Sequence, residues 1–71
     1  MERRKTGARE VILEFYQVGN YVRVSAMDAA TLTEAIIVGS AKASQDELER
    51  LAIRKLEYIL AKAARQPGTR R

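Results

Sequence analysis

The residues of this chain that could do chemistry are serines, lysines and carboxylates, because its 71 residues include no histidine and no cysteine. That absence removes the commonest proton shuttle, thiol nucleophiles, disulfides and the usual structural zinc sites. Ser40 and Lys42, in the stretch VGSAKAS, have the residue types of a serine–lysine nucleophile pair. A polar loop before a helix explains them more simply, and Ser25 and Ser44 have no histidine to activate them either. We therefore predict no enzyme activity, no metal, no cofactor and no small-molecule substrate.

Carboxylates and a glycine–lysine loop offer two further kinds of chemistry. Glu10 and Glu14 fall on one face of a predicted strand, where acidic side chains usually form a solvated surface. So small a domain offers no evident cleft that would make one of them a general acid. Gly39 and Lys42 precede a helix, as in a phosphate-binding loop, but the spacing differs and the acidic first turn of that helix would repel an anion.

The net charge of +4 belongs to the two ends of the chain. Residues 1–9 carry four basic residues and one acidic residue, and residues 65–71 carry three basic residues and no acidic one. The middle, residues 10–64, carries six basic and eight acidic residues, for a net charge of −2. Basic ends can contact polyanions without specificity, although they also keep a small protein soluble.

A β-hairpin is predicted around the Gly19-Asn20 pair. Apolar and polar residues alternate between Arg9 and Val18, which is typical of a strand buried on one face. Gly and Asn both tolerate the positive φ that a tight hairpin turn requires. Counting outward from a two-residue turn places Phe15 opposite Val24. The same count puts Val11, Leu13, Val22 and Ala26 on the face that carries this pair.

A third strand and a long helix are predicted after the hairpin. Residues 28–33 contain turn formers, and residues 34–39 are rich in β-branched residues, although either Ala35 with Ile37 or Ile36 with Val38 could face the core. Ser44 and Glu47 then have the spacing of a helix capping box. Apolar residues recur behind them at intervals of three and four: Leu48, Leu51, Ala52, Leu56, Ile59, Leu60 and Ala63.

These elements predict an α+β fold, in which a three-stranded antiparallel β-meander packs on one C-terminal α-helix in two layers. Residues 1–8 are expected to be a disordered basic segment, residues 9–64 the α+β domain, and residues 65–71 a disordered basic tail. No apolar run approaches the roughly 20 residues that cross a bilayer, and the N-terminus lacks a signal-peptide pattern. A cytoplasmic, unprocessed chain is therefore expected.

A single helix covers only one face of a sheet, so the other face is predicted to be open. The candidate interaction surface on that face consists of Ile12, Tyr16, Tyr21, Arg23 and Met27. A contiguous group of exposed apolar residues indicates a contact surface. The predicted function is therefore binding, to a protein partner or to a second copy of the chain.

A basic stripe on the predicted helix supports an alternative function. Its candidate polyanion contacts are Arg50, Arg54, Lys55, Tyr58 and Lys62. Basic residues beside an aromatic can hold a phosphate backbone, but Glu47, Glu49 and Glu57 dilute the charge, as on an ordinary solvated helix face. The alternative is a weak, salt-sensitive nucleic-acid-binding accessory protein that uses this stripe and the basic tails.

Three segments of the chain together resemble a known family. They read E-F-x-x-x-G-N-x-V-R-V-x-A from Glu14, D-A-A-T-x-x-E from Asp28, and L-x-x-x-A-x-x-K-L-x-Y-x-L from Leu48. In these motifs the chain is similar to a family of short uncharacterised alphaproteobacterial proteins, in which glycine is usual at the position of Leu32. The resemblance spans most of the chain outside its tails. It implies a compact domain and transfers no catalytic residue.

Overall fold

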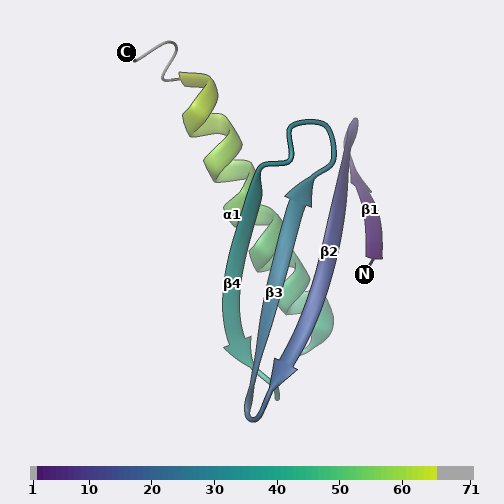
Figure 1. Ribbon diagram of the computed structural model, residues 1–71, viewed down its shortest axis with the longest axis vertical. Coiled ribbons are helices and arrows are strands. Elements are labelled where there is room, and N and C mark those ends of the chain that lie inside the picture. The colour runs from purple at the N-terminus through teal and green to yellow at the C-terminus, as the bar shows by residue number, and fades with distance from the viewer. Residues whose placement is uncertain (1, 66–71) are drawn as a thin grey trace.

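A computed structural model describes residues 2–65, which form one sheet and one helix. The strands are β1 (Glu2–Thr6), β2 (Arg9–Val18), β3 (Tyr21–Asp28) and β4 (Glu34–Ser40), and the helix is α1 (Gln45–Arg65). The sheet order is β1-β2-β3-β4 with every neighbouring pair antiparallel, so the chain forms a meander (Figure 1). No helix within the described residues combines the length and hydrophobicity that crossing a membrane requires.

The α+β class and the C-terminal helix are confirmed, but the prediction of three strands is wrong, because β1 adds a fourth. Residues 2–6, expected to be irregular, pair with β2 from Glu2 opposite Leu13 to Thr6 opposite Arg9. Gly7, at φ 64°, makes the turn between the two strands. Ion pairs replace apolar contacts here: Arg3 pairs with Glu10, and Arg4 Nη1 lies 3.1 Å from Glu49 Oε2 on α1.

The predicted hairpin register is confirmed residue by residue. Phe15 lies opposite Val24, and the two-residue turn at Gly19-Asn20 joins Val18 to Tyr21. Gly19 has φ 57° while Asn20 does not have a positive φ, which is the pattern of a type II′ turn. The face that carries Phe15 and Val24 contains the core residues Val11, Leu13 and Ala26.

The orientation of β4, which the sequence left open, is settled by its pairing with β3. Ala35 pairs with Ala26 and Ile37 with Val24, so both face the helix. Gly39 has the same parity and lies so close to α1 that a Cβ there would overlap the side chain of Leu48. Ile36 and Val38 consequently lie on the opposite face of the sheet.

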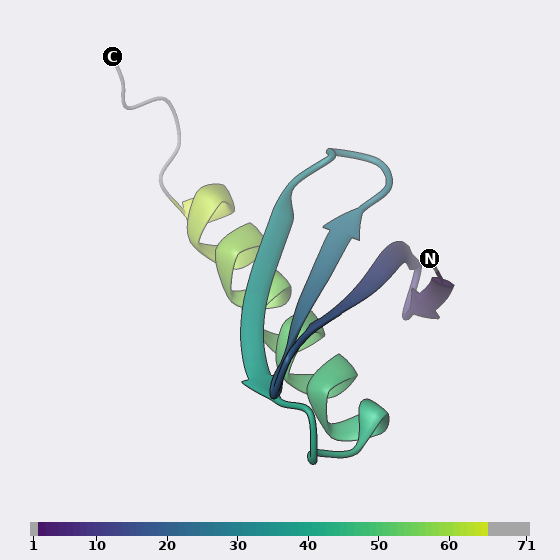
Figure 2. The same cartoon turned by 60° about the horizontal axis from the view of Figure 1, so that its bottom comes forward.

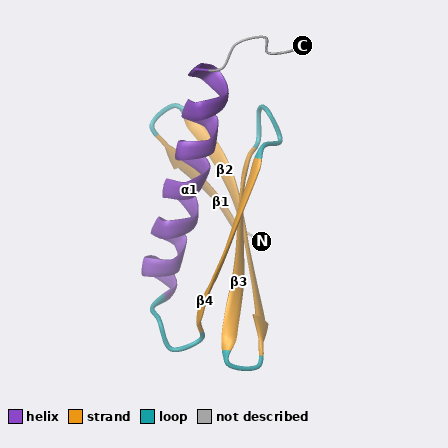
Figure 3. Cartoon of the chain, turned by 90° about the vertical axis from the view of Figure 1, so that its left-hand side faces the viewer, coloured by secondary structure: helices purple, strands orange, loops and turns teal. Residues whose placement is uncertain are grey.

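The helix covers one face of the sheet, where it packs on β3 and β4 (Figure 3). The predicted N-cap is confirmed, since the Glu47 N–H donates to Ser44 Oγ at 3.1 Å. Leu48, Ala52 and Leu56 are buried, whereas Leu51, predicted for the core, is 46% exposed. Arg65 belongs to α1, and the rest of the predicted disordered tail lies outside the described residues.

Candidate interaction surface

The open face of the sheet is the surface opposite α1, and strand parity places all five predicted contact residues on it. Ile12 pairs with Met27, Tyr16 with Arg23, and Val18 with Tyr21 across the β2–β3 ladder. β4 extends the surface, because Val38 pairs with Arg23 and Ile36 with Ser25. We define the open face by its apolar members, which are Ile12, Tyr16, Val18, Tyr21, Met27, Ile36 and Val38.

Nothing within residues 2–65 covers the open face. Figure 3 shows α1 on the other side of the sheet, and β1, which could have folded across the open face, continues the sheet at its edge instead. The sheet is twisted, with β1 at the edge far from β4 (Figure 2). Tyr16 is 65% exposed and Val38 63% exposed, while Ile12, Met27 and Ile36 are half-buried by their neighbours.

Polar side chains on the open face largely satisfy one another. The Ser25 hydroxyl donates to the Glu34 carboxylate, and Arg3 donates to Glu10. Glu14, the remaining acid, lies opposite Ser25 in the ladder, and Arg23 sits between Tyr16 and Val38. The face is therefore an apolar surface with balanced charges.

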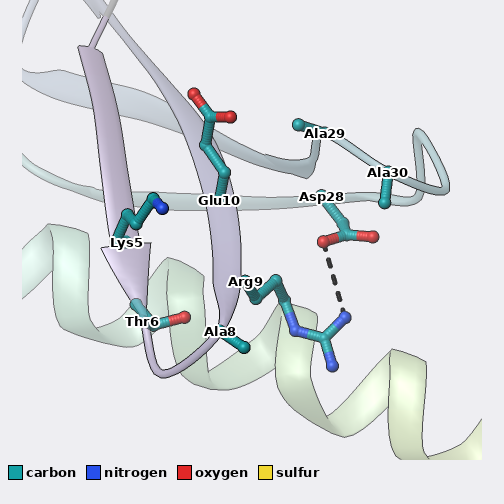
Figure 4. Close-up of a pocket in the computed structure, with 8 residues that line it drawn as sticks. All are labelled: Lys5, Thr6, Ala8, Arg9, Glu10, Asp28, Ala29 and Ala30. Carbon is teal, nitrogen blue, oxygen red and sulfur yellow. Dashed lines mark hydrogen bonds and ion pairs between the residues drawn. The ribbon is translucent and has the colours of Figure 1, made fainter.

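A cleft of about 630 Å³ lies at one end of the sheet, between the β1–β2 turn and the β3–β4 loop (Figure 4). Its buried carboxylate, Asp28, accepts hydrogen bonds from Thr31 Oγ1 at 2.8 Å and from Thr31 N–H at 3.0 Å. Arg9 Nη1 lies 3.4 Å from the other carboxylate oxygen. The Thr31 hydroxyl bond is the main reason that the pKa of Asp28 is lowered, against a smaller opposing effect of burial.

The polar contacts in this cleft join the β3–β4 loop to the start of β2. Asp28 also organises its loop through the backbone, since its carbonyl accepts the Leu32 N–H at 2.7 Å. Two cations, Lys5 and Arg9, and two anions, Glu10 and Asp28, line the cleft, so it selects neither sign of ligand. The oxygen of the Thr6 hydroxyl is buried there and has no partner among the described residues.

The predicted basic stripe lies on the exposed surface of α1. Four of its members, Arg50, Arg54, Tyr58 and Lys62, are exposed and form no ion pair within residues 2–65, whereas the exposed Lys55 donates from Nζ to the Ile36 carbonyl oxygen at 2.8 Å. Glu47 and Glu57 are exposed on the same helix. The stripe thus divides between a contact with the edge of the sheet and an ordinary solvated surface.

The serines singled out in the sequence each form a hydrogen bond in the structure, two of them with the backbone. Ser40 Oγ accepts the Lys42 N–H at 3.0 Å, which shapes the loop between β4 and α1. Ser44 caps the helix, and Ser25 is buried against Glu34 on the open face. Within residues 2–65 no group of three or more His, Cys, Asp or Glu residues could hold a metal ion.

Comparison with known proteins found one family. A family model described as a domain of unknown function (DUF6898) matches residues 8–63, which include β2, β3, β4 and almost all of α1. The match agrees with the resemblance to an uncharacterised family that the three sequence motifs indicate. No curated protein and no solved structure matches the chain.

Proposed function

The chain belongs to the DUF6898 family, whose description assigns no function, and we propose that it is a small non-enzymatic domain that binds a protein partner through its open face. One observation carries this proposal: a row of large apolar side chains lies exposed on the face that α1 does not cover. Tyr16, Val18, Tyr21 and Val38 are all exposed large hydrophobic residues.

Aromatic residues supply the main binding contacts in this proposal. Tyrosine is enriched among the residues that contribute most to protein interfaces, because it buries a large area and keeps a hydroxyl for a hydrogen bond. Tyr16 and Tyr21 lie near the β2–β3 turn, with Arg23 beside Tyr16 in the ladder. Arg is the other residue that such interfaces favour, so this end of the open face is the expected centre of binding.

A matched pair of tyrosines tests the proposal. Tyr16 on the open face and Tyr58 on α1 are 65% and 61% exposed, so changing either one to lysine perturbs the fold equally little. The wild-type chain, Tyr16→Lys and Tyr58→Lys would each be used to capture proteins from a lysate of the source organism. Captured proteins would then be purified and titrated against isotope-labelled chain.

We expect Tyr16→Lys to weaken binding at least about tenfold and Tyr58→Lys to leave it unchanged. Backbone amide shifts should change at Tyr16, Tyr21 and Val38 on titration. The proposal is wrong if no purified protein binds the wild-type chain, or if Tyr16→Lys binds as well as the wild type.

A weaker second candidate is nucleic-acid binding through the basic stripe. The observation in its favour is that the part of α1 from Arg54 to Arg65 carries four basic residues and only one acidic residue, with Tyr58 exposed among them. The affinity for nucleic acid would fall steeply between about 50 and 200 mM salt, because a few phosphate contacts would each release counterions on binding. A chain that does not bind a mixed-sequence duplex at low salt would eliminate this candidate.

A further inference from the structure

The outer edge of β4 is an unpaired strand edge. β4 is the last strand of the sheet, so only its β3 side is hydrogen-bonded. Backbone bonds from Asp28 N to Thr33 O and from Ala41 N to Asn20 O fix which residues point toward β3. Because alternate residues of an antiparallel strand bond to the same neighbour, the odd-numbered residues between 33 and 41 bond to β3. The N–H and C=O groups of Ile36 and Val38 therefore point outward.

Apolar side chains from two elements border this edge. Lys55 reaches the Ile36 carbonyl from α1, which places that flank of the helix over the edge. Leu51 and Tyr58 lie four residues before and three residues after Lys55, and therefore on the same flank. They are 46% and 61% exposed, and Val38 on the strand itself is 63% exposed. Exposed apolar side chains of both the helix and the strand therefore border the edge.

The helix that borders this edge is charged unequally along its length. Residues 45–53 contain three acidic residues and one basic residue, for a net charge of −2, while residues 54–65 contain four basic residues and one acidic residue, for a net charge of +3. An antiparallel partner of the same sequence would place acidic half against basic half. Glu49 pairs with Arg4 on β1, so the charged residues on the Lys55 flank beside the β4 edge include Glu47 near the start of α1 and Lys62 near its end. These two charges are complementary to each other under a two-fold rotation.

We propose that two copies of the chain join edge to edge through β4, so that two four-stranded sheets become one antiparallel sheet with both α1 helices on the same face. If the two-fold axis passes between Arg54 and Lys55, Leu51 of one copy lies opposite Tyr58 of the other, and Glu47 opposite Lys62. The pairing of the two β4 strands is then centred near Ile36. The hydrogen bond from Lys55 to the Ile36 carbonyl shows that this residue lies beside the middle of α1.

This inference goes beyond the proposed function, because the contact uses the edge and leaves the open face free. Ile36 and Val38 lie at that edge, so the open faces of the two copies would meet there as one continuous surface.

Lys55 opposes the association, so substitutions at this residue should change the affinity between the two copies. In the single chain its ammonium group satisfies the outward carbonyl of Ile36. In the pair, a backbone N–H of the second copy takes that carbonyl, and Lys55 is released beside Arg54 of the second copy, where like charges repel. A lysine that guards a strand edge is a common protection against edge-to-edge pairing. Lys55→Met should therefore tighten the association, whereas a substitution that merely damages the fold would not.

Sedimentation of the full chain tests the proposal, from micromolar concentrations to about 1 mM. We expect a concentration-dependent rise toward twice the chain mass of 8.0 kDa. Tyr58→Glu and Val38→Pro should each weaken the association at least about tenfold. Tyr16→Glu, equally exposed but on the open face, should leave the association unchanged. Circular dichroism of each variant checks that its fold is retained.

A charge exchange tests the antiparallel arrangement of the helices. Lys62→Glu places like charges opposite each other twice, and should weaken the association by about 2- to 30-fold for the loss of two surface ion pairs. Adding Glu47→Lys restores the pairs with reversed sign and should recover most of the loss. A wild-type chain that stays monomeric at about 1 mM overturns the proposal. A dimer that survives Tyr58→Glu and Val38→Pro but is lost in Tyr16→Glu also overturns it, since the open face would then be the contact.

Discussion

Leu32 is the non-glycine residue with a positive φ within residues 2–65, and the backbone there can be tested directly. Its φ is 64°, in the left-handed region where a Cβ is unfavourable, and its side chain is 68% exposed. We predict that Leu32→Gly is more stable than Leu32→Ala, although glycine is normally the less stable of the two.

The expected difference is about 1 kcal/mol in the free energy of unfolding. A left-handed conformation costs a residue with a Cβ roughly 1–2 kcal/mol. The greater freedom of glycine in the unfolded chain returns about 0.5–1 kcal/mol of that advantage. Both variants lose the same partly buried leucine side chain, so comparing them with each other removes that contribution and isolates the backbone.

Urea denaturation followed by circular dichroism measures this difference. Ala30, exposed in the same loop and without a positive φ, provides the control, because Ala30→Gly should be destabilising in the ordinary way. If Leu32→Gly proves less stable than Leu32→Ala, residue 32 does not hold a left-handed backbone. The β3–β4 loop would then have a different backbone conformation next to Asp28.

Two further perturbations test the packing and the electrostatics. Gly39→Ala should lower the free energy of unfolding by about 1–3 kcal/mol, because the new methyl group would overlap Leu48. This loss should be smaller in a Leu48→Ala background, which a double-mutant cycle by urea denaturation would measure. Purely additive effects of the two substitutions would contradict the close contact. The lowered pKa of Asp28 means that its carboxylate stabilises the fold above the pKa of the unfolded chain, near 4, and that this stabilisation is lost as the pH falls through the lower folded value. Thermal melts should therefore show the wild type more stable than Asp28→Asn at pH 7, with a gap that closes in acid; a gap independent of pH would contradict the assigned hydrogen bonds.

The parts of the fold that the sequence predicted correctly are those that local chemistry determines. Gly19 supplies the positive φ of the hairpin turn, and a two-residue turn then fixes every pair in the β2–β3 ladder by counting. Ser44 caps the first turn of the helix in the same local way. Those two features were sufficient to place Ile12, Tyr16, Tyr21, Arg23 and Met27 on the open face.

β1 was missed because its stability does not come from apolar residues. The segment ERRKT contains no apolar residue, so hydrophobic periodicity gives no signal for it. Its strand forms through the ladder with β2 and through ion pairs with Glu10 and Glu49, which lie 7 and 45 residues farther along the chain from Arg3 and Arg4. The available signal was Gly7, which stands at a two-residue turn between Thr6 and Arg9, as Gly19 does between Val18 and Tyr21.

The orientation of β4 could not be decided from hydrophobicity, because both of its faces are apolar, and small residues on either side of Ile37 fit the face that α1 covers. The face toward α1 carries Ala35 and Gly39, whose small side chains let the helix approach closely enough for Leu48 to fill the space above Gly39. The larger pair, Ile36 and Val38, consequently points to the side that no helix covers. A strand selected only for folding would carry polar residues at those two positions, as edge strands usually do. Apolar residues that lie outside the core are the reason that both proposed contacts, on the open face and at the β4 edge, involve this strand.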